Sequence, residues 1–386
     1  MIDMIIQRYD RQLITYLGIL TIIGTIMLYS ASWYESFNSS NGRTDMLFLQ
    51  NHLKRLLVGT FFLFCFIVID YRKLKEIAPY LIISSIVLLV ATKGFYLLKG
   101  YSWYKPARWL YIGPLSLQTS DIARFSIIIF MAYYADKKRE SLKEFQTGLL
   151  PALFVLIIIM ALIIIQPDYS TALMIGVIGF IILFIGGAEI SHLSLSGACA
   201  LLIGIPVLIS RSYRLERLLD FLGVGNNADI GYQAKQSLNS LGNGGWLGVG
   251  LGNSIEKNHF LPTPHTDFIF AIIGEELGLV LGTIPVLTLF ILIFLRGLKI
   301  AKKCTDHFGV FLSLGIAFNL VLYAFVNAAV VTGILPVTGL PMPMVSYGGS
   351  GMVVNMAMMG ILLNISQSRR SVVGSRSWSP IFNGYP

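Results

Sequence analysis

The sequence predicts an all-α integral membrane protein with about ten transmembrane helices. The chain of 386 residues is 55% hydrophobic and only 13% charged, whereas soluble domains carry about 25% charged residues. Its apolar runs approach the roughly 20 residues that a helix needs to cross a bilayer, and they recur along the whole length. Because a bilayer leaves a single lipid-exposed segment no other way to satisfy its backbone groups, we assign each run to a helix.

The predicted spans follow one another from the first apolar run to the last. The first comes after Arg8 and Arg11, and residues 13–29 are long enough to cross a bilayer, so we expect an uncleaved signal anchor there. The ten spans are predicted at residues 12–32, 54–70, 79–98, 119–135, 148–165, 169–187, 193–210, 268–295, 308–333 and 350–367.

The distribution of lysine and arginine predicts that both termini are cytoplasmic. With the N-terminus inside, the inner loops hold 16 of the 29 Lys and Arg residues. Five of the others lie in one long outer loop, where charges count less toward orientation. The formal net charge of +9 therefore reflects membrane orientation. Nucleic acid is not expected as a partner, because no basic stripe with interleaved aromatic residues lies on a soluble module.

Residues 211–267 form the longest segment between two predicted spans and lie outside the cytoplasm in this orientation. Such long loops are usually functional or disordered, and this one contains too many leucine and aromatic residues for disorder. We expect short amphipathic helices that lie at the membrane interface. Residues 1–370 would then form one transmembrane domain, and residues 371–386 a disordered cytoplasmic tail.

The most informative polar residues surround the start of the eighth predicted span. Asp267 lies at its outer mouth, where partial desolvation would raise the pKa of the carboxyl group and suit a general base. An aspartate in this place can instead cap the free amide groups of the helix, and the residues alone leave both interpretations open. Glu275 and Glu276 lie about two turns deeper, where a carboxylate needs a partner. We expect them to pair with Arg or Lys and to hold helices together.

Two further motifs place charges at the outer ends of other spans. Asp168, in the turn Gln166–Pro167–Asp168, would either line a cavity for polar head groups or form the N-cap of the sixth span. Arg124 lies within a span and therefore requires a partner, for which Asp121 is the local candidate.

The segment 338–350 is rich in Pro, Gly and Ser and contains Ser346. It cannot face lipid at membrane depth, so it should be re-entrant or line a polar cavity. The glycine cluster at 248–252 lacks the strand and the GK[ST] sequence of nucleotide sites. His259 and His265 have no standard metal-ligand spacing, and a structural role is favoured for His265.

In their order along the chain, these segments resemble the SEDS family (shape, elongation, division and sporulation proteins of the FtsW/RodA type). The resemblance extends from the first span to about Ser366. Gly-Asn-Ser followed by Lys257 is similar to the division branch, FtsW. The strings that carry the resemblance are Ala107–Arg108–Trp109, Gln166–Pro167–Asp168, Gly231–Tyr232–Gln233, Gly250–Leu251–Gly252–Asn253–Ser254, His265–Thr266–Asp267, Gly274–Glu275–Glu276–Leu277–Gly278 and Ser346–Tyr347–Gly348–Gly349–Ser350.

The resemblance implies a ten-helix peptidoglycan glycosyltransferase of the bacterial cytoplasmic membrane that serves cell division or cell shape. Its substrate would be lipid II, a disaccharide-peptide on undecaprenyl diphosphate, its partner a class B penicillin-binding protein, and its catalytic residue Asp267. A divalent cation, magnesium or manganese, is the one cofactor considered; the metal is unknown, and no organic cofactor is expected. The outer-face cations available to the diphosphate are Arg108, Arg214, Arg217 and Lys257. Asp168, His265 and Ser346 complete the candidate substrate-binding residues, with Asp121, Arg124, Glu275 and Glu276 in support.

Six positions depart from the family pattern. At two of them Asp121 replaces a glutamate and Arg124 a lysine, so that the acid and the base are retained. Thr119 replaces a proline, Tyr323 a glutamine, and Gly351 a serine. Thr263 replaces a glutamate, which puts a cation site in doubt. Two other functions stay open: a lipid II flippase, which would need acids at the midplane accessible from both sides, and a non-enzymatic scaffold that recruits the penicillin-binding protein.

Overall fold

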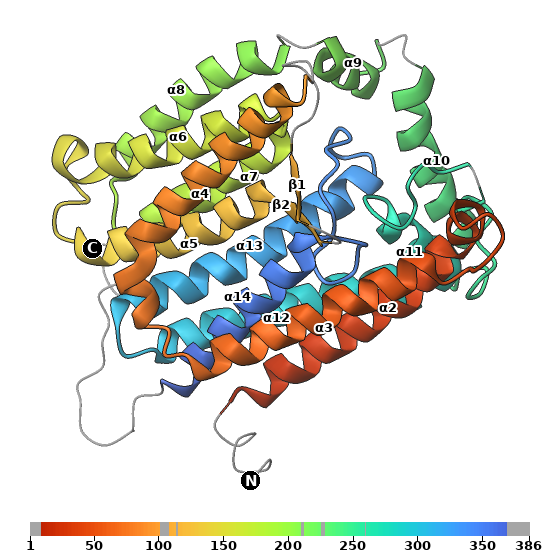
Figure 1. Cartoon of the computed structure of the whole chain (residues 1–386), viewed down its shortest axis with the longest axis horizontal. Coiled ribbons are helices and arrows are strands. Elements are labelled where there is room, and N and C mark those ends of the chain that lie inside the picture. Colours follow the sequence, from red (N-terminus) through yellow and green to blue (C-terminus); the bar gives the residue numbers. More distant parts are fainter. Residues whose placement is uncertain are drawn as a thin grey trace.

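The computed structural model describes residues 9–100, 108–112, 115–209, 212–224, 228–258 and 260–368. The described residues form a bundle of long helices with one small hairpin (Figure 1). The helices are α2 (Arg11–Ser39), α3 (Leu47–Val68), α4 (Lys73–Leu98), α5 (Thr119–Lys137), η1 (Phe145–Leu149), α6 (Leu150–Ile165), α7 (Tyr169–Ile185), α8 (Ile190–Ile209), α9 (Ser212–Phe221), α10 (Ala228–Gly244), α11 (Ile269–Gly278), η2 (Leu279–Thr283), α12 (Ile284–Lys303), α13 (His307–Val331) and α14 (Ser350–Gln367).

Most of the long helices in the bundle have the length and the apolar composition of membrane-spanning helices. Within the described residues, six helices are long and apolar enough to cross a bilayer, if Phe145–Ile165 and Ile269–Lys303 each count as one. The apolar helices Tyr169–Ile185 and Ile190–Pro206 are shorter. Every predicted span overlaps a helix, so the all-α membrane architecture is confirmed at this level.

Local sequence signals explain where several helices begin. Asp10 accepts a hydrogen bond from the amide of Leu13 at 3.0 Å and thereby caps α2. Asp306 caps α13 in the same way through Gly309, at 2.9 Å. Both carboxylates satisfy amide groups that have no partner within the helix.

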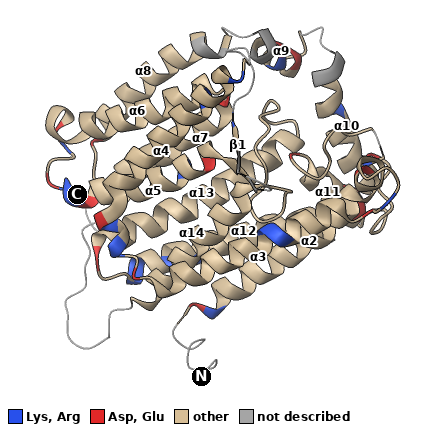
Figure 2. Ribbon diagram, viewed as in Figure 1, with Lys and Arg blue, Asp and Glu red and all other residues tan. Residues whose placement is uncertain are grey.

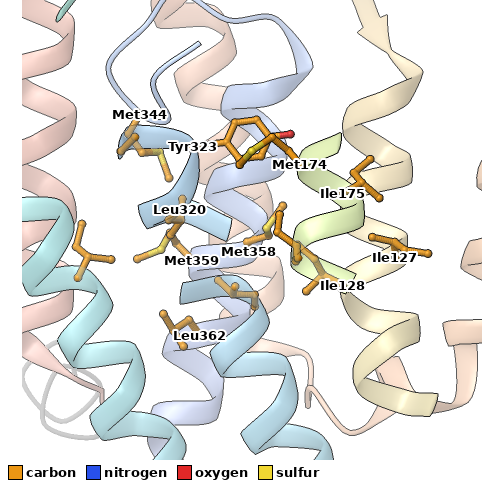
Figure 3. Close-up of a cluster of buried hydrophobic side chains, with 14 of the residues drawn as sticks. Ile127, Ile128, Met174, Ile175, Leu320, Tyr323, Met344, Met358, Met359 and Leu362 are labelled. Atoms are coloured by element: carbon orange, nitrogen blue, oxygen red, sulfur yellow. The ribbon is translucent and has the colours of Figure 1, made fainter. Parts of the chain in front are cut away.

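The apolar core lies where α14 packs against its neighbours. Figure 3 shows Met358, Met359 and Leu362 of α14 facing Leu320 of α13. Ile127 and Ile128 of α5 close the cluster from another side (Figure 3), and all six side chains are buried. Methionine adapts its shape to such gaps between helices. The packing of α14 therefore fixes the position at which the preceding polar segment, 338–350, ends.

One element was not predicted. A hairpin follows α4, in which β1 (Trp109–Ile112) pairs with antiparallel β2 (Leu115–Gln118), and Trp109 lies opposite Gln118. The strands flank Gly113–Pro114 and alternate apolar and polar residues in part, which is a hairpin signal. The purely α-helical prediction is wrong at this point. The hairpin brings Arg108 and Gln118 to the N-terminal end of α5.

The eighth predicted span is broken into α11, η2 and α12. Gly278 has a positive φ of 73° at the break, and a β-carbon there would lie 2.3 Å from the amide nitrogen of Gly248. Gly248 likewise has a φ of 82° and touches the backbone of Glu276. Only glycine fits at such a crossing of two backbones. The loop before the span is thus packed directly against the break.

The long outer loop contains the two helices α9 and α10, as short amphipathic helices were predicted. However, α10 does not simply lie at an interface, because it packs along α11. The Ser240 hydroxyl of α10 donates to the carbonyl of Ala271 at 3.1 Å. The described remainder, residues 245–258 and 260–268, is irregular. The predicted disordered tail, 371–386, lies outside the described residues.

Candidate active site

A cavity of about 520 Å³ lies between the hairpin, the start of α7, the residues before α11 and the segment that precedes α14. The predicted polar segment 338–350 lines it, as expected for a stretch that cannot face lipid. The charged residues that line the cavity are Arg55, Arg108, Asp121, Arg124, Asp168 and Asp267. Several predicted site residues that lie far apart in the sequence therefore share one cavity.

Asp267 is half-buried in the wall of this cavity and does not cap a helix. The N-cap of α11 is Phe268, and no side chain caps it. The amide nitrogen Nδ2 of Asn327 donates to the carbonyl of Asp267 and to that of Leu340, both at 2.8 Å. A β-carbon on Gly339 would lie 3.5 Å from Asp267 Oδ2. The backbone of Asp267 is thus fixed between α13 and the 338–350 segment, with its carboxylate in the cavity.

The environment of Asp267 makes its carboxyl group more basic than usual. Burial raises its pKa, and the positive charges of Arg217, His265 and Arg108 offset part of that effect. Arg217 comes from α9 and donates through Nη1 to the carbonyl of Val337 at 2.9 Å. A carboxylate with a raised pKa can accept a proton nearer to neutral pH, which is the property of a general base.

His265 supports this wall and does not line the cavity. Its ring packs against Phe48 at 4.4 Å and Tyr347 at 5.5 Å between centroids. Its Nδ1 lies 3.1 Å from a carboxylate oxygen of Glu35, and its carbonyl accepts from the amide of Tyr347 at 2.8 Å. The structural role favoured for this histidine fits these contacts, and its assignment as a substrate contact does not.

Asp168 and Arg108 form a second wall of the cavity. Arg108 Nη1 lies 3.9 Å from Asp168 Oδ1, and Nη2 donates to the carbonyl of Pro167. Gln118 and Ser120 donate to Asp168 Oδ2 at 3.2 and 3.1 Å. Although Asp168 holds the N-cap position of α7, its side chain does not cap the helix. Of its two interpretations, the structure supports the cavity wall.

Arg124 lies deeper, and its partners are the ones that its place in a helix requires. Its Nη2 lies 3.2 Å from Asp121 Oδ1 and donates to Asn355 Oδ1 at 3.2 Å. The guanidinium carbon lies 4.5 Å from the centre of the Tyr323 ring. Tyr323, one of the departures from the family pattern, thus supplies an aromatic face that attracts the cation.

Arg124→Ala should lower the amount of folded protein in membranes, because Asp121 would lose its cation in a buried site. Arg124→Lys, which keeps the charge, should be milder. Fluorescence-detected size-exclusion chromatography after heating measures the effect. Lys137→Ala is the matched control, since Lys137 is an exposed residue of the same helix. An Arg124→Ala protein as heat-stable as wild type would show that the ion pair contributes nothing to folding.

Lys257 does not reach the cavity, although it was predicted as a substrate-binding cation. It is 4% exposed, and its Nζ lies 2.6 Å from Glu276 Oε1. The hydroxyl of Ser30 donates to the same carboxylate at 2.6 and 2.7 Å. The expected pairing of Glu276 with a cation is therefore present, and it joins the outer loop, α11 and α2.

Glu275 is also buried, but no Lys or Arg that the structure describes pairs with it, so the expectation of a cationic partner is wrong among these residues. Its carboxylate accepts from the hydroxyls of Ser240 at 2.9 Å and Ser254 at 2.5 Å, and from the amide of Ile255 at 3.0 Å. Hydrogen bonds of this kind can satisfy a buried carboxylate without a counter-charge. Together, the two glutamates fasten the loop that leads to Asp267.

Of the remaining predicted residues, Ser346 lies at the cavity and Arg214 lies in the outer loop. Ser346 lines the cavity, and its Oγ accepts from the amide of Met342 at 2.8 Å. Arg214 belongs to α9, but its side chain lies outside the described part of the structure. Sequence reasoning missed Arg55, whose guanidinium lies 4.6 Å from the centre of the Tyr347 ring. An arginine at the start of a predicted span was the available signal.

No group of three His, Cys, Asp or Glu side chains within the described ranges is arranged to hold a metal ion. Asp121, Asp168 and Asp267 all line the cavity, but among the described residues they do not form a group that could hold a metal ion. These side chains do not by themselves form a site for magnesium or manganese, which prefer several oxygen ligands.

Comparison with known proteins identifies a family and several relatives that this chain resembles. The sequence model of the cell cycle protein family FTSW_RODA_SPOVE matches residues 10–371. The chain is 36% identical over 364 residues to the probable peptidoglycan glycosyltransferase FtsW of Geobacter sulfurreducens, covering 94% of this chain and 96% of that protein. It is 33% identical over 367 residues to the stage V sporulation protein E of Bacillus subtilis, covering 94% and 98%.

Two solved structures share the fold. One is a chain from a study of the structural coordination of polymerization and crosslinking by a peptidoglycan synthase complex, with a TM-score of 0.75, 24% identity, and coverage of 94% of this chain and 98% of that one. The other is the rod shape determining protein RodA of Thermus thermophilus, with a TM-score of 0.66, 22% identity, and coverage of 94% and 98%.

Proposed function

This chain belongs to the FtsW/RodA/SpoVE family of cell cycle proteins, and from that premise we propose that it is a peptidoglycan glycosyltransferase that polymerises lipid II. One observation carries the proposal for the site: the Asp267 carboxylate and the Arg108 guanidinium line the same polar cavity. A base and a cation in one cavity suit the transfer of a sugar from a diphosphate.

We propose an inverting transfer with Asp267 as the general base. The acceptor's 4-hydroxyl oxygen attacks the anomeric carbon of the donor, and its proton passes to the Asp267 carboxylate. As the new carbon–oxygen bond forms, the bond to the diphosphate breaks, and undecaprenyl diphosphate leaves with the electron pair. The leaving group needs charge neutralisation more than protonation. Arg108 and Arg217 are the two arginines whose charges lower the pKa of Asp267. They are therefore the candidates to neutralise the charge of the leaving group.

The pH dependence of polymerisation should reveal the base. Because Asp267 must be deprotonated, the rate should fall as the pH drops through its raised pKa. Arg217 lowers this pKa in part, so Arg217→Gln should move the acidic limb of the kcat/KM profile to higher pH. Arg72→Gln, at an exposed position outside the cavity, should leave the limb in place. An unchanged limb in Arg217→Gln would contradict the coupling between Arg217 and the base.

The orientation in the membrane forms part of the proposal. We place ten spans in the bacterial cytoplasmic membrane with both termini inside, so that the cavity with Asp267 opens toward the outer face. The positive-inside distribution of Lys and Arg supports this orientation. The overlap of each predicted span with a helix supports the placement of the spans.

Cysteine labelling in intact cells tests the orientation. In a variant that lacks Cys65, Cys199 and Cys304, we expect Asn239→Cys on α10 to react with an impermeant maleimide. Glu140→Cys should react only after permeabilisation. Both positions are exposed, so accessibility depends on the side of the membrane. The reverse pattern would exclude both the orientation and chemistry at the outer face.

We further propose that the protein acts with a class B penicillin-binding protein, which crosslinks the glycan strands. The solved chain of similar fold belongs to a study of a peptidoglycan synthase complex. A flippase is the second candidate, because the Asp121–Arg124 ion pair lines the same cavity within a helix of the bundle.

Reconstitution with fluorescent lipid II tests the function and separates the rivals. The purified protein with its partner should produce glycan strands that a gel resolves, and lysozyme should digest them. A flippase would instead expose lipid II to the opposite leaflet of a vesicle without producing strands. A scaffold would show neither activity and would only retain the partner. Strand synthesis that persists without this protein would contradict the proposal.

A further inference from the structure

A second cavity, of about 210 Å³, lies far from Asp267. It is formed by the start of α2, the last turns of α12 and the end of α14. The residues that line it are Asp10, Arg296, Lys299, Ile300, Lys303, Ile365, Ser366 and Ser368. The 20 residues of α12 carry the chain about 30 Å, at 1.5 Å per residue. The two cavities therefore lie at opposite ends of the bundle, and this one serves no step of the proposed transfer.

The charges of this cavity are unbalanced. Arg296 donates through Nε and Nη2 to Asp10 Oδ1, at 3.1 and 3.0 Å, so this pair neutralises itself. Lys299 and Lys303 have no ion pair with any residue that the structure describes, and both are exposed. Three cations thus face one carboxylate. Figure 2 shows Lys and Arg residues gathered at this end of the bundle, where α14 ends.

The spacing brings the two lysines together. Residues four apart lie on one face of a helix and are neighbours, so the two ammonium groups repel each other unless an anion lies between them. Arg296 shares this face, since three and seven residues separate it from the lysines. The arrangement therefore favours an anion that can offer a separate oxygen to each lysine, as the phosphodiester group of a lipid does.

The size and the walls narrow the class of ligand. The cavity is smaller than the roughly 300–1,000 Å³ of sites for drug-sized molecules, so it suits a phosphate group rather than a disaccharide or a nucleotide. Ile300 and Ile365 give it apolar walls beside the charges. Lysine can keep its ammonium group in the polar layer while its stem lies on apolar surface. A phosphate attached to an apolar body matches both features.

We propose that this cavity binds the phosphate group of an anionic membrane lipid, such as phosphatidylglycerol, through Lys299 and Lys303. Arg296 fixes the cavity by holding Asp10, and the apolar walls receive the first atoms of the lipid's glycerol and acyl region. In the proposed orientation, the site faces the cytoplasmic leaflet, where anionic headgroups attract Lys and Arg. The inference does not depend on the reaction at Asp267.

Native mass spectrometry and thermal unfolding of the full chain in neutral detergent test the site. Phosphatidylglycerol should remain bound and raise the melting temperature, whereas phosphatidylcholine should do neither. The variant Lys299→Gln/Lys303→Gln should bind phosphatidylglycerol about tenfold or more weakly, since each lysine contributes about 1 kcal/mol near an anionic headgroup. Lys73→Gln/Lys143→Gln removes the same charge from exposed positions outside the cavity and should bind as wild type does.

Three results would overturn the proposal. Equal binding of the two lipids would remove the requirement for an anion, and a double lysine variant that binds as wild type would remove the site. Inorganic phosphate that stabilises the protein as strongly as phosphatidylglycerol would assign the cavity to free phosphate and not to a lipid. Polymerisation of lipid II by the double variant should equal that of wild type, which shows that the protein is folded.

Discussion

Asp267→Asn is expected to reduce the polymerisation of lipid II by at least about a hundredfold, since general-base catalysis typically contributes about 10²–10⁴-fold. The asparagine keeps the size of the side chain but cannot accept the proton of the acceptor hydroxyl. The backbone of Asp267 is held by Asn327, and its side chain caps no helix. The substitution should therefore leave the abundance of the protein near wild type.

Initial rates of strand synthesis, measured beside membrane abundance and co-purification of the penicillin-binding partner, check this result. Asp267→Glu should recover little activity, because an added methylene displaces the base by about an ångström and positioning matters at that scale. Asp70→Asn, at an exposed aspartate outside the cavity, is the matched control. Activity that survives in Asp267→Asn would refute the base. Loss of activity together with abundance would indicate a structural role.

Lys257→Met should destabilise the protein by about 3–5 kcal/mol, the typical result when a buried ion pair loses one partner. Glu276 is 1% exposed. Without Lys257, its buried carboxylate would keep only the hydrogen bond from Ser30 among its present contacts. The double variant Lys257→Met/Glu276→Gln removes both charges and should recover most of the loss. The non-additivity of this cycle isolates the pair from the packing of the lysine stem.

Thermal unfolding of the purified variants in the same detergent measures the cycle. Lys235→Met, at an exposed lysine of α10, controls for the loss of a charge in the same loop. If Lys257 instead contacted substrate, the single variant would keep wild-type stability and show a raised KM. That outcome would return Lys257 to the binding role that its sequence motif suggested.

The sequence was sufficient for the helices because the bilayer simplifies their signal. Apolar runs of bilayer length can only be helices, and each predicted span overlaps one. The hairpin before α5 was missed because its strands have only four residues each, too short for their alternation to stand out among apolar runs.

The sequence predicted some residues of the site correctly and misassigned others, for a physical reason. Asp267, Asp168 and Arg108 share a cavity because loops from three parts of the chain meet there, as their position at the outer ends of spans suggested. Lys257 was misassigned because sequence cannot tell whether a loop residue faces a cavity or a buried carboxylate. Likewise, hydroxyls and amides that satisfy Glu275 come from a loop whose fold no periodicity describes.

The contact between Gly248 and Gly278 limits how this protein can be engineered. Replacing a loop glycine by alanine is a common way to gain stability, because it restricts the unfolded chain. Here both residues have positive φ, and a methyl group on either would overlap the other segment's backbone. Mutating both would add two clashes and relieve neither. Directed evolution for a more heat-resistant enzyme will therefore find its gains away from this crossing.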